Sequence, residues 1–418
     1  MLQAEKIKEI ILKQKSFFKT GKTKEYTFRL NNLKKIKELV INHEKEIYKA
    51  LNSDLKKSKT ESYLSEIGPV LTELNFYIKN LKKWIKPQKV KNPIFLPFAK
   101  SYIKYEPLGI CSIFATWNYP VNLSLNPLIS SIAAGNCSAL KVSEKSGETS
   151  RLLAKMLNQS FNENYLKVIE GNHQTANHLL EQKVDLIFFS GSSRVGKTVM
   201  RNAANNLTPL ILELGGKSPC IVDKETDIKK TAQKIVWGKF LNSGQTCIAP
   251  DYLLVHREIK PELIENLKTA IEKFFSKDPR NSPDFSKIIN IEHFERLNKL
   301  LNLHRENVIY GGKTDKNSLY ISPTLLVNLN PGSEIQKQEI FGPLLPIIEI
   351  NSIDEAIEYV NKKPKPLTLY IFSKNKKNQI TITKNTSSGS VSVNEVLLHI
   401  ASPYLPFGGV GKSGMGRY

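Results

Sequence analysis

After residue 110 the chain repeats one pattern, a short apolar segment followed by an amphipathic one, and this pattern limits the fold most. Continuous Ile-, Val- and Leu-rich runs are typical of parallel strands, which are buried on both faces. We expect strands at 110–115, 138–142, 166–169 and 186–189, each followed by a helix, at 123–134, 148–159, 173–181 and 194–205. This order predicts an α/β fold with a doubly wound parallel sheet, which would bind a nucleotide at the carboxyl ends of its strands.

A second α/β region follows residue 214, and a helical region precedes residue 100. Strands are expected at 219–222, 252–255 and 367–372, with helices at 228–241, 262–275 and 353–360. Near the N-terminus, apolar residues such as Leu33, Ile36 and Val40 recur at helical spacing. The alternation of polar and apolar residues at 102–106 is typical of an exposed two-stranded ribbon. The 418 residues are too many for one ordinary domain and suggest two or three.

The formal charge of +22 raises the question of a nucleic-acid or membrane partner. The lysines are spread along the whole chain, and no RNA-binding, zinc-finger or basic-zipper pattern accompanies them. The uncharged stretch 107–140 is long enough to cross a membrane, but its amides and prolines, such as Asn118 and Pro120, favour a soluble core. We therefore expect no nucleic-acid partner and no membrane span.

The cysteines indicate the compartment. Cys111, Cys137, Cys220 and Cys247 form no Cys-x-x-Cys pair, and the histidines are not clustered, so we expect no metal site. A disulfide framework is not expected in a large chain that builds its own core. The sequence therefore favours a reducing, cytoplasmic location.

Three segments carry groups suited to chemistry. Cys247 follows a predicted helix in a polar segment of small residues, where a thiol is accessible, although a lone loop cysteine is more often incidental. Glu213 stands in an apolar run, as either a general base whose pKa is raised by burial or an ion-paired structural residue. The turn 191–196 joins a strand to a helix and suits a pyrophosphate, but its glycine spacing differs from Gly-x-Gly-x-x-Gly.

Seven segments, in this order and spacing, resemble the aldehyde dehydrogenase superfamily from about residue 61 to residue 418. They are Thr-Trp-Asn-Tyr-Pro at 116–120, Lys-Val-Ser-Glu at 141–144, Phe-Ser-Gly-Ser at 189–192, Leu-Glu-Leu-Gly-Gly-Lys at 212–217, Gly-Gln-Thr-Cys at 244–247, Glu-Ile-Phe-Gly-Pro at 339–343 and Pro-Phe-Gly-Gly-Val-Gly at 406–411. The form of the first segment and the ending Ser-Gly-Met-Gly-Arg-Tyr are similar to the class 3 branch, whose members handle fatty and aromatic aldehydes.

The resemblance implies the oxidation of an aldehyde to a carboxylic acid through a thiohemiacetal and a thioester on Cys247. It implies that the side-chain amide of Asn118 and the backbone N–H of Cys247 stabilise the oxyanion. Glu213 would then activate the water that releases the acid. The aldehyde channel would be lined by Tyr119, Trp237 and Thr246, although Trp237 is equally compatible with ordinary core packing.

The cofactor implied by the resemblance is NAD, with NADP as an alternative. The implied cofactor-binding residues are Trp117, Lys141, Glu144, Gly191, Ser192, Gly196, Leu214, Glu339 and Phe341. Of these, Glu339 would hold the nicotinamide ribose, and Lys141 and Glu144 the adenosine ribose. A carboxylate at 144 accepts from a ribose 2′-hydroxyl and repels a 2′-phosphate, which mildly favours NAD.

The expected domains are a cofactor-binding domain at 1–213 that includes an oligomerisation ribbon at 99–109, a catalytic domain at 214–395, and a C-terminal segment at 396–418 that returns to the domain interface. The resemblance implies a homodimer. Relatives usually continue with a C-terminal tail beyond this point, so the dimer contact and the substrate gate are expected to differ here.

Two other functions compete with this one. An acylating relative would pass the acyl group to coenzyme A, but such relatives generally lack a base at the position of Glu213. A non-catalytic basic binding protein would not need Asn118, Glu213, Cys247 and Glu339 together. The sequence does not identify the aldehyde, because the pocket depends on loops such as 385–389 and 399–405.

Overall fold

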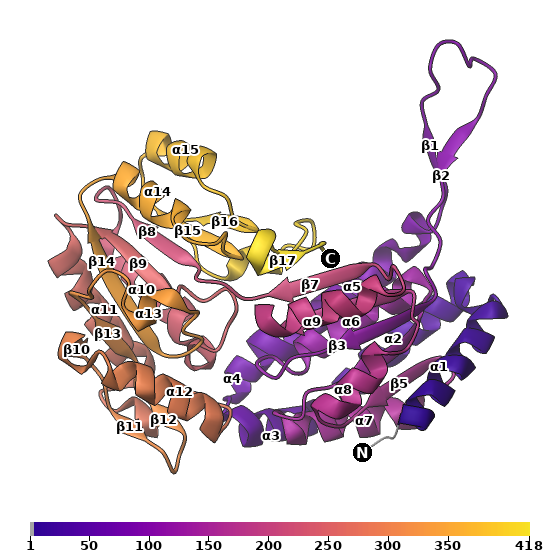
Figure 1. Ribbon diagram of the computed structural model, residues 1–418, viewed down its shortest axis with the longest axis horizontal. Coiled ribbons are helices and arrows are strands. Elements are labelled where there is room, and N and C mark those ends of the chain that lie inside the picture. Colours follow the sequence, from indigo (N-terminus) through magenta and orange to yellow (C-terminus); the bar gives the residue numbers. More distant parts are fainter. Residues whose placement is uncertain (1–3) are drawn as a thin grey trace.

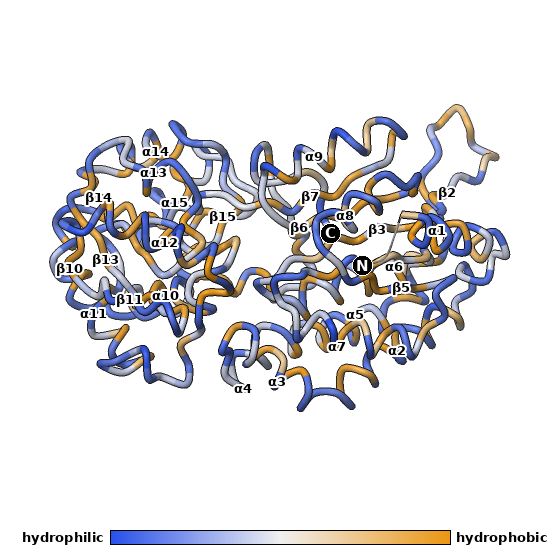
Figure 2. Tube along the Cα trace, turned by 60° about the horizontal axis from the view of Figure 1, so that its bottom comes forward, coloured by the Kyte–Doolittle hydropathy of each residue, from blue (hydrophilic) through white to orange (hydrophobic). Residues whose placement is uncertain are grey.

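The computed structural model describes residues 4–418 as two α/β lobes that lie side by side (Figure 1). The expected fold class is confirmed, since each lobe contains a mainly parallel sheet covered by helices. Apolar segments concentrate along the strands inside the lobes, while hydrophilic segments lie in the outer helices and loops (Figure 2). Each lobe therefore buries its own core, as expected for strands that are apolar on both faces.

The sheet of the first lobe has six strands in the order β17-β7-β6-β3-β4-β5. Their bounds are β3 Ile110–Phe114, β4 Cys137–Lys141, β5 Leu166–Ile169, β6 Leu186–Gly191, β7 Leu210–Leu214 and β17 Gly414–Met415. All pairs are parallel except β17 with β7. The strand order reverses between β3 and β6, and ligands of doubly wound sheets bind beyond the carboxyl ends of the strands at such a reversal.

Helices cover both faces of this sheet. The connecting helices are α6 Asn122–Ala134, α7 Gly147–Ser160, α8 His173–Leu180 and α9 Ser193–Ala204, and the N-terminal helices are α1 Ala4–Lys19, α2 Tyr26–Asn42, α3 Glu44–Leu55, α4 Lys59–Ser62 and α5 Gly68–Trp84. The apolar face of α6 is fully buried at Leu128, Ile129 and Ile132, and full burial of each such side chain contributes about 1.5–3 kcal/mol.

The second lobe contains a seven-stranded sheet in the order β10-β13-β14-β9-β8-β15-β16. The strands are β8 Pro219–Val222, β9 Tyr252–His256, β10 Val308–Tyr310, β13 Thr324–Leu326, β14 Leu344–Ile350, β15 Thr368–Phe372 and β16 Ser390–Val393. A small hairpin joins β11 Thr314–Asp315 to β12 Tyr320–Ile321. The helices are α10 Ile228–Phe240, α11 Lys260–Phe275, α12 Ile291–Asn302, α13 Glu334–Lys337, α14 Ile353–Asn361 and α15 Lys376–Asn385.

A two-stranded ribbon projects from the first lobe (Figure 1). It pairs β1 Gln88–Val90 with β2 Ser101–Ile103, so it starts earlier than the segment expected from the alternation, and residues 104–109 form no strand. Its tip carries the almost fully exposed side chains of Ile94 and Phe98. Isolated two-stranded ribbons are marginally stable in water, and this one exposes its apolar residues at the tip.

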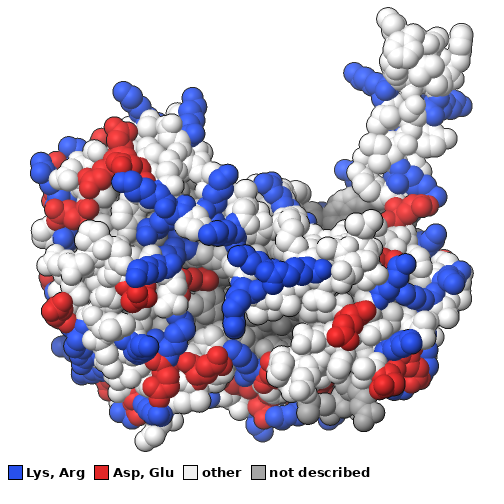
Figure 3. Space-filling view, viewed as in Figure 1, with Lys and Arg blue, Asp and Glu red and all other residues white. Residues whose placement is uncertain are grey.

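Charged residues of both signs are interspersed on the face shown in Figure 3, where the surface between the lobes is hollowed and partly rimmed by basic side chains. Among the described residues, no helix has the length and apolar character needed to cross a membrane.

Candidate active site

The loop after β3 carries Asn118 to the point where the strand order reverses. Asn118 is almost completely buried, and its Nδ2 donates to the main-chain oxygen of Gln245 over 3.0 Å. Its Oδ1 has no hydrogen-bond partner among residues 4–418. An amide nitrogen has two hydrogens, so one remains available to a ligand.

Cys247 follows three consecutive residues in the left-handed region, Asn242, Ser243 and Gly244 (φ 52°, 51° and 73°). This conformation is unfavourable for residues other than glycine, and such strain is typical of functional sites. A side chain at Gly244 would collide with the backbone of Gly342, because a Cβ atom would lie 2.4 Å from its oxygen. Gln245 holds the segment, since its Nε2 donates to the carbonyls of Asn242 and Lys287, each over 3.0 Å.

The pKa of the half-buried Cys247 thiol is raised to about 12, chiefly by burial and then by the nearby carboxylates of Glu339 and Glu213. Hydrogen bonds from the backbone amides of Cys247 and Ile248 oppose this rise. These amides therefore lie close to the sulfur, next to the place where the oxygen of an attacked aldehyde would become negatively charged.

Glu213 lies near the end of β7, opposite Gly414 of β17. Only 6% of the residue is exposed, and neither carboxylate oxygen has a hydrogen-bond partner in the described part of the chain. Burial raises its pKa to about 8. Because no ion pair satisfies this carboxylate, the ion-paired structural interpretation does not apply, and a buried group with such a pKa suits a general base.

Glu339 lies against the Gly-Gly turn that follows β7. A Cβ atom on Gly215 would lie 2.0 Å from a Glu339 carboxylate oxygen, so a side chain there would displace this carboxylate. Burial and the nearby Asp251 raise the Glu339 pKa to about 8, while a hydrogen bond from the Gly216 amide opposes the rise. Lys217 fastens the loop by pairing with Asp251 and donating to the carbonyl of Gln338 over 2.9 Å.

The turn between β6 and α9 fits a pyrophosphate. Ser192 caps α9, and its hydroxyl accepts from the Val195 amide over 3.4 Å. Gly196 packs against Leu214, because a Cβ atom there would lie 2.8 Å from a Leu214 methyl group. Gly191 ends the strand and Ser192 is exposed, so a ligand can reach this turn at the N-terminal end of α9, where helix amides favour a phosphate.

Lys141 is the last residue of β4, and Glu144 lies three residues further along the chain. Lys141 is buried, and its Nζ lies 3.3 Å from a Glu144 carboxylate oxygen and 2.7 Å from the main-chain oxygen of Val142. Glu144 is exposed, so its carboxylate is accessible to a ribose hydroxyl.

Trp117 and Phe341 meet edge to face with their ring centroids 5.4 Å apart. Phe341 has a left-handed backbone (φ 48°), which directs the loop after Glu339. The sequence did not single out His293, whose ring lies 4.9 Å from that of Trp117 and whose Nε2 lies 3.0 Å from Lys145 Nζ. Burial and the nearby Lys145 lower the pKa of His293 to about 4, so its imidazole is neutral at pH 7. The amphipathic pattern of α12, on which His293 lies, does not indicate that this side chain contacts Trp117 of the other lobe.

Of the expected channel residues, Tyr119 and Thr246 are joined by a hydrogen bond of 2.5 Å between their hydroxyls. This bond connects the Asn118 loop to the Cys247 loop. Trp237 lies on α10 and is half-buried against the core of the second lobe. This position is compatible both with a channel residue and with ordinary core packing.

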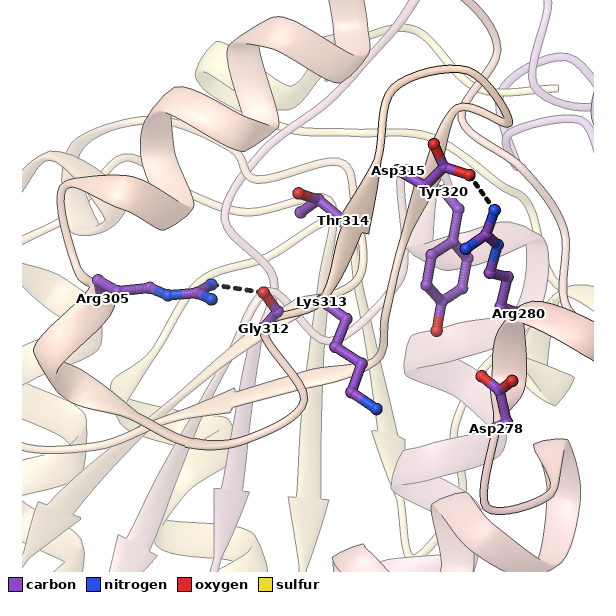
Figure 4. A pocket seen from close by; sticks show the side chains of 8 residues that line it. All are labelled: Asp278, Arg280, Arg305, Gly312, Lys313, Thr314, Asp315 and Tyr320. Carbon is purple, nitrogen blue, oxygen red and sulfur yellow. Dashed lines mark hydrogen bonds and ion pairs between the residues drawn. The ribbon is translucent and has the colours of Figure 1, made fainter.

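A separate polar pocket lies beside the β11–β12 hairpin (Figure 4). It is lined by Asp278, Arg280, Arg305, Gly312, Lys313, Thr314, Asp315 and Tyr320. Arg280 pairs with Asp315 and Arg305 donates to the Gly312 carbonyl, so two of its cations are already satisfied. None of the expected site residues lines it. In residues 4–418, no group of three or more His, Cys, Asp and Glu could hold a metal ion.

Comparison with known proteins gives a consistent result. The model of the aldehyde dehydrogenase family matches residues 1–418. The 4,4'-diaponeurosporen-aldehyde dehydrogenase of Staphylococcus aureus is 44% identical, over 97% of this chain and 88% of the relative. The dimeric, NADP-preferring aldehyde dehydrogenase of Rattus norvegicus is 42% identical, over 99% of this chain and 90% of the relative. Aldehyde dehydrogenase family 3 member A2 of Pongo abelii is 41% identical, over 96% of this chain and 82% of the relative.

The solved structure of substrate-bound Staphylococcus aureus AldH superimposes with a TM-score of 0.97 and 43% sequence identity, covering 99% of this chain and 90% of that one. The chain therefore belongs to the aldehyde dehydrogenase family, and the resemblance to its class 3 branch is confirmed. It is an NAD(P)-dependent oxidoreductase that oxidises aldehydes to carboxylic acids.

Proposed function

We propose that aldehyde oxidation proceeds through a covalent thioester on Cys247. The Cys247 thiol gives up its proton to water, its Sγ atom attacks the aldehyde carbon, and the Asn118 amide and the Cys247 backbone N–H stabilise the resulting oxyanion. When bound, NAD(P)+ would supply the acceptor for the hydride that leaves this thiohemiacetal, so that a thioester remains on Cys247. Glu213 then takes a proton from water, which attacks the thioester and releases the acid and the thiol.

The observation that carries this proposal is the buried carboxylate of Glu213, which has no hydrogen-bond partner within residues 4–418 and lies close enough to Cys247 to raise the pKa of its thiol. A structural glutamate would have a partner, because an unsatisfied buried carboxylate is costly. A base that activates water needs a free carboxylate beside the acyl group, which also favours hydrolysis over transfer to coenzyme A.

The residues of the expected cofactor site fit an NAD(P) dinucleotide on three counts. The exposed N-terminal end of α9 suits the pyrophosphate, the Gly215 position admits the Glu339 carboxylate, and Glu144 is exposed beside Lys141. We assign Glu339 to the nicotinamide ribose and the Lys141–Glu144 pair to the adenosine ribose. Trp117 and Phe341 border the ring position, and Leu214 packs under the α9 turn.

The charge at Glu144 should control the choice of cofactor. In Glu144→Gln, kcat/KM for NADP relative to NAD is expected to rise about tenfold, because a like-charge contact of about 1.4 kcal/mol is removed. The exposed Glu148→Gln is the matched control and should leave the ratio unchanged. An unchanged ratio in both variants would refute the role of Glu144 in cofactor choice.

The proposed substrates are medium- or long-chain aliphatic or aromatic aldehydes. Tyr418 lies near enough to Glu213 and Cys247 for their charges to affect its pKa, and it also lies near Tyr77. Tyr77 belongs to an aromatic group in which Phe76 contacts Trp84 and Tyr404, in each case with ring centroids 5.4 Å apart. Tyr404 belongs to the 398–405 segment, which exposes further apolar side chains, and apolar surface favours an apolar substrate.

A panel of short, long-chain and aromatic aldehydes with NAD and NADP tests this proposal. We expect kcat/KM to increase with chain length by about 0.8 kcal/mol, or roughly fourfold, for each buried methylene until the aromatic group is covered. Equal kcat/KM for acetaldehyde and a long-chain aldehyde would contradict the substrate class. Product formation that requires coenzyme A would contradict hydrolysis.

We further propose a homodimer in which the ribbon tip, with Ile94, Phe95 and Phe98 exposed, packs on a second copy. The relative from Rattus norvegicus is named as dimeric, which supports this assembly. The four free thiols support a reducing, cytoplasmic location.

A further inference from the structure

A buried ion pair lies beneath the loop that carries Asn118. Lys57 and Glu66 have no exposed side-chain surface, and Lys57 Nζ lies 2.7 Å from Glu66 Oε1. Lys57 follows α3, while Glu66 lies in a π-helical turn, Tyr63–Ile67, between α4 and α5. Such turns occur frequently at functional sites.

The pair holds both ends of one short segment. Lys57 Nζ donates to the main-chain oxygen of Asn118 over 2.9 Å. Glu66 Oε2 accepts from the backbone amides of Val121 and Asn122, over 3.0 Å and 2.9 Å, at the start of α6. The two charges therefore hold the main chain of residues 118–122 at both of its ends.

The same segment is tied to the nucleophile loop. Asn242 Nδ2 donates to the main-chain oxygen of Asn118 over 2.8 Å, beside the Lys57 contact. Lys57 Nζ also lies 4.1 Å from the centroid of the Tyr119 ring, a cation–π distance, and Tyr119 bonds to Thr246. The Asn118 carbonyl is thus the point at which the ion pair and the Cys247 loop meet.

Stability alone does not explain this pair. Burying two charges costs several kcal/mol for each ion, and replacement of buried pairs by neutral residues of similar volume is often neutral or stabilising. Among residues 4–418, the other side-chain hydrogen bonds of the pair all go to one five-residue segment, so the pair restricts the position of that segment.

We propose that Lys57 and Glu66 are positioning residues that fix the main chain at Asn118, so that its side-chain amide meets the oxyanion on Cys247. This inference rests on the proposed role of Asn118. In this role, Lys57 and Glu66 touch neither the substrate nor the cofactor.

The test is the variant Lys57→Met/Glu66→Gln. It removes both charges together, keeps the side-chain volumes, and leaves a carbonyl oxygen for the amides of Val121 and Asn122. We expect kcat/KM for a good aldehyde to fall about 10–100-fold, less than the ~10²–10³-fold loss typical of removing an oxyanion donor. Alkylation of Cys247 by iodoacetamide develops no oxyanion. The alkylation rate and the affinity for NAD should therefore each stay within about twofold of the parent values.

Arg29→Met is the matched control. Arg29 is a buried cation that donates to the carbonyls of Thr23 and Ala133, and Ala133 lies at the opposite end of α6. This variant should lose thermal stability and keep kcat/KM. Equal losses of alkylation rate, NAD affinity and kcat/KM in Lys57→Met/Glu66→Gln would show a general structural effect and overturn the inference.

A double-mutant cycle separates this inference from the proposed function. In an Asn118→Ala background the two changes should cost less than about twofold more, because the group that they position is gone. Losses that multiply would overturn the positioning role while leaving Asn118 as the oxyanion donor. Full activity in Asn118→Ala alone would overturn the oxyanion assignment itself, and the inference with it.

Discussion

Replacement of Cys247 by alanine is expected to lower kcat by roughly 10⁴–10⁶-fold, the range seen when a covalent nucleophile is removed. The physical reason is that the remaining groups, Asn118 and Glu213, can polarise the aldehyde and activate water but cannot form the thiohemiacetal. NADH formation under single-turnover conditions should disappear, and binding of NAD to the purified variant should remain.

The matched control is Cys220→Ala. Cys220 lies on β8 and is completely buried, and burial raises the pKa of its thiol. This variant should lose some stability through the small cavity, but it should keep the NADH burst. Cys247→Ala with more than a tenth of the parental kcat would contradict the thioester mechanism.

Glu213→Gln is expected to separate the two halves of the reaction. Acylation should still release one NADH per active site, whereas kcat should fall by about 10²–10⁴-fold, because water at the thioester has lost its base. Stopped-flow absorbance at the NADH band measures both phases. An absent burst would move the role of Glu213 to activation of the thiol.

The pKa of Glu213 sets the pH dependence. The base acts when ionised, so the hydrolysis rate of the parent enzyme should rise with pH through about 8 and should lose this dependence in Glu213→Gln. Stability should change in the opposite direction. The folded protein keeps this carboxyl protonated between its ordinary value of 4.5 and about 8, while the unfolded chain ionises there, so rising pH weakens the fold. Glu213→Gln should therefore melt at a higher temperature than the parent at pH 8.5.

Much of the fold follows from local pattern. The predicted strand at 186–189 corresponds to β6, Leu186–Gly191, and the predicted helix at 194–205 corresponds to α9, Ser193–Ala204. Both succeed because buried parallel strands are continuously apolar and their helices are amphipathic. The ribbon was placed less well, because its first strand, Gln88–Val90, is exposed throughout and carries no apolar alternation.

The active-site residues were expected from motif resemblance, and the geometry that joins them was not. The left-handed conformation of Asn242 and Ser243 depends on tertiary hydrogen bonds, although an Asn-Ser-Gly run is a recognisable turn signal. The contacts of Lys57 with Asn118 and of His293 with Trp117 join residues far apart in the chain. No sequence period reports such contacts, since they arise only when the lobes and helices pack.

The central claim, a thioester on Cys247 that Glu213 hydrolyses, is tested most directly by mass spectrometry of Glu213→Gln after acid quenching. The variant is mixed with NAD and a long-chain aldehyde and stopped after the burst. The account predicts that the protein gains the mass of one acyl group, located on the peptide that contains Cys247, and that hydroxylamine removes it. An unmodified Cys247 peptide at the end of a full NADH burst would contradict the account.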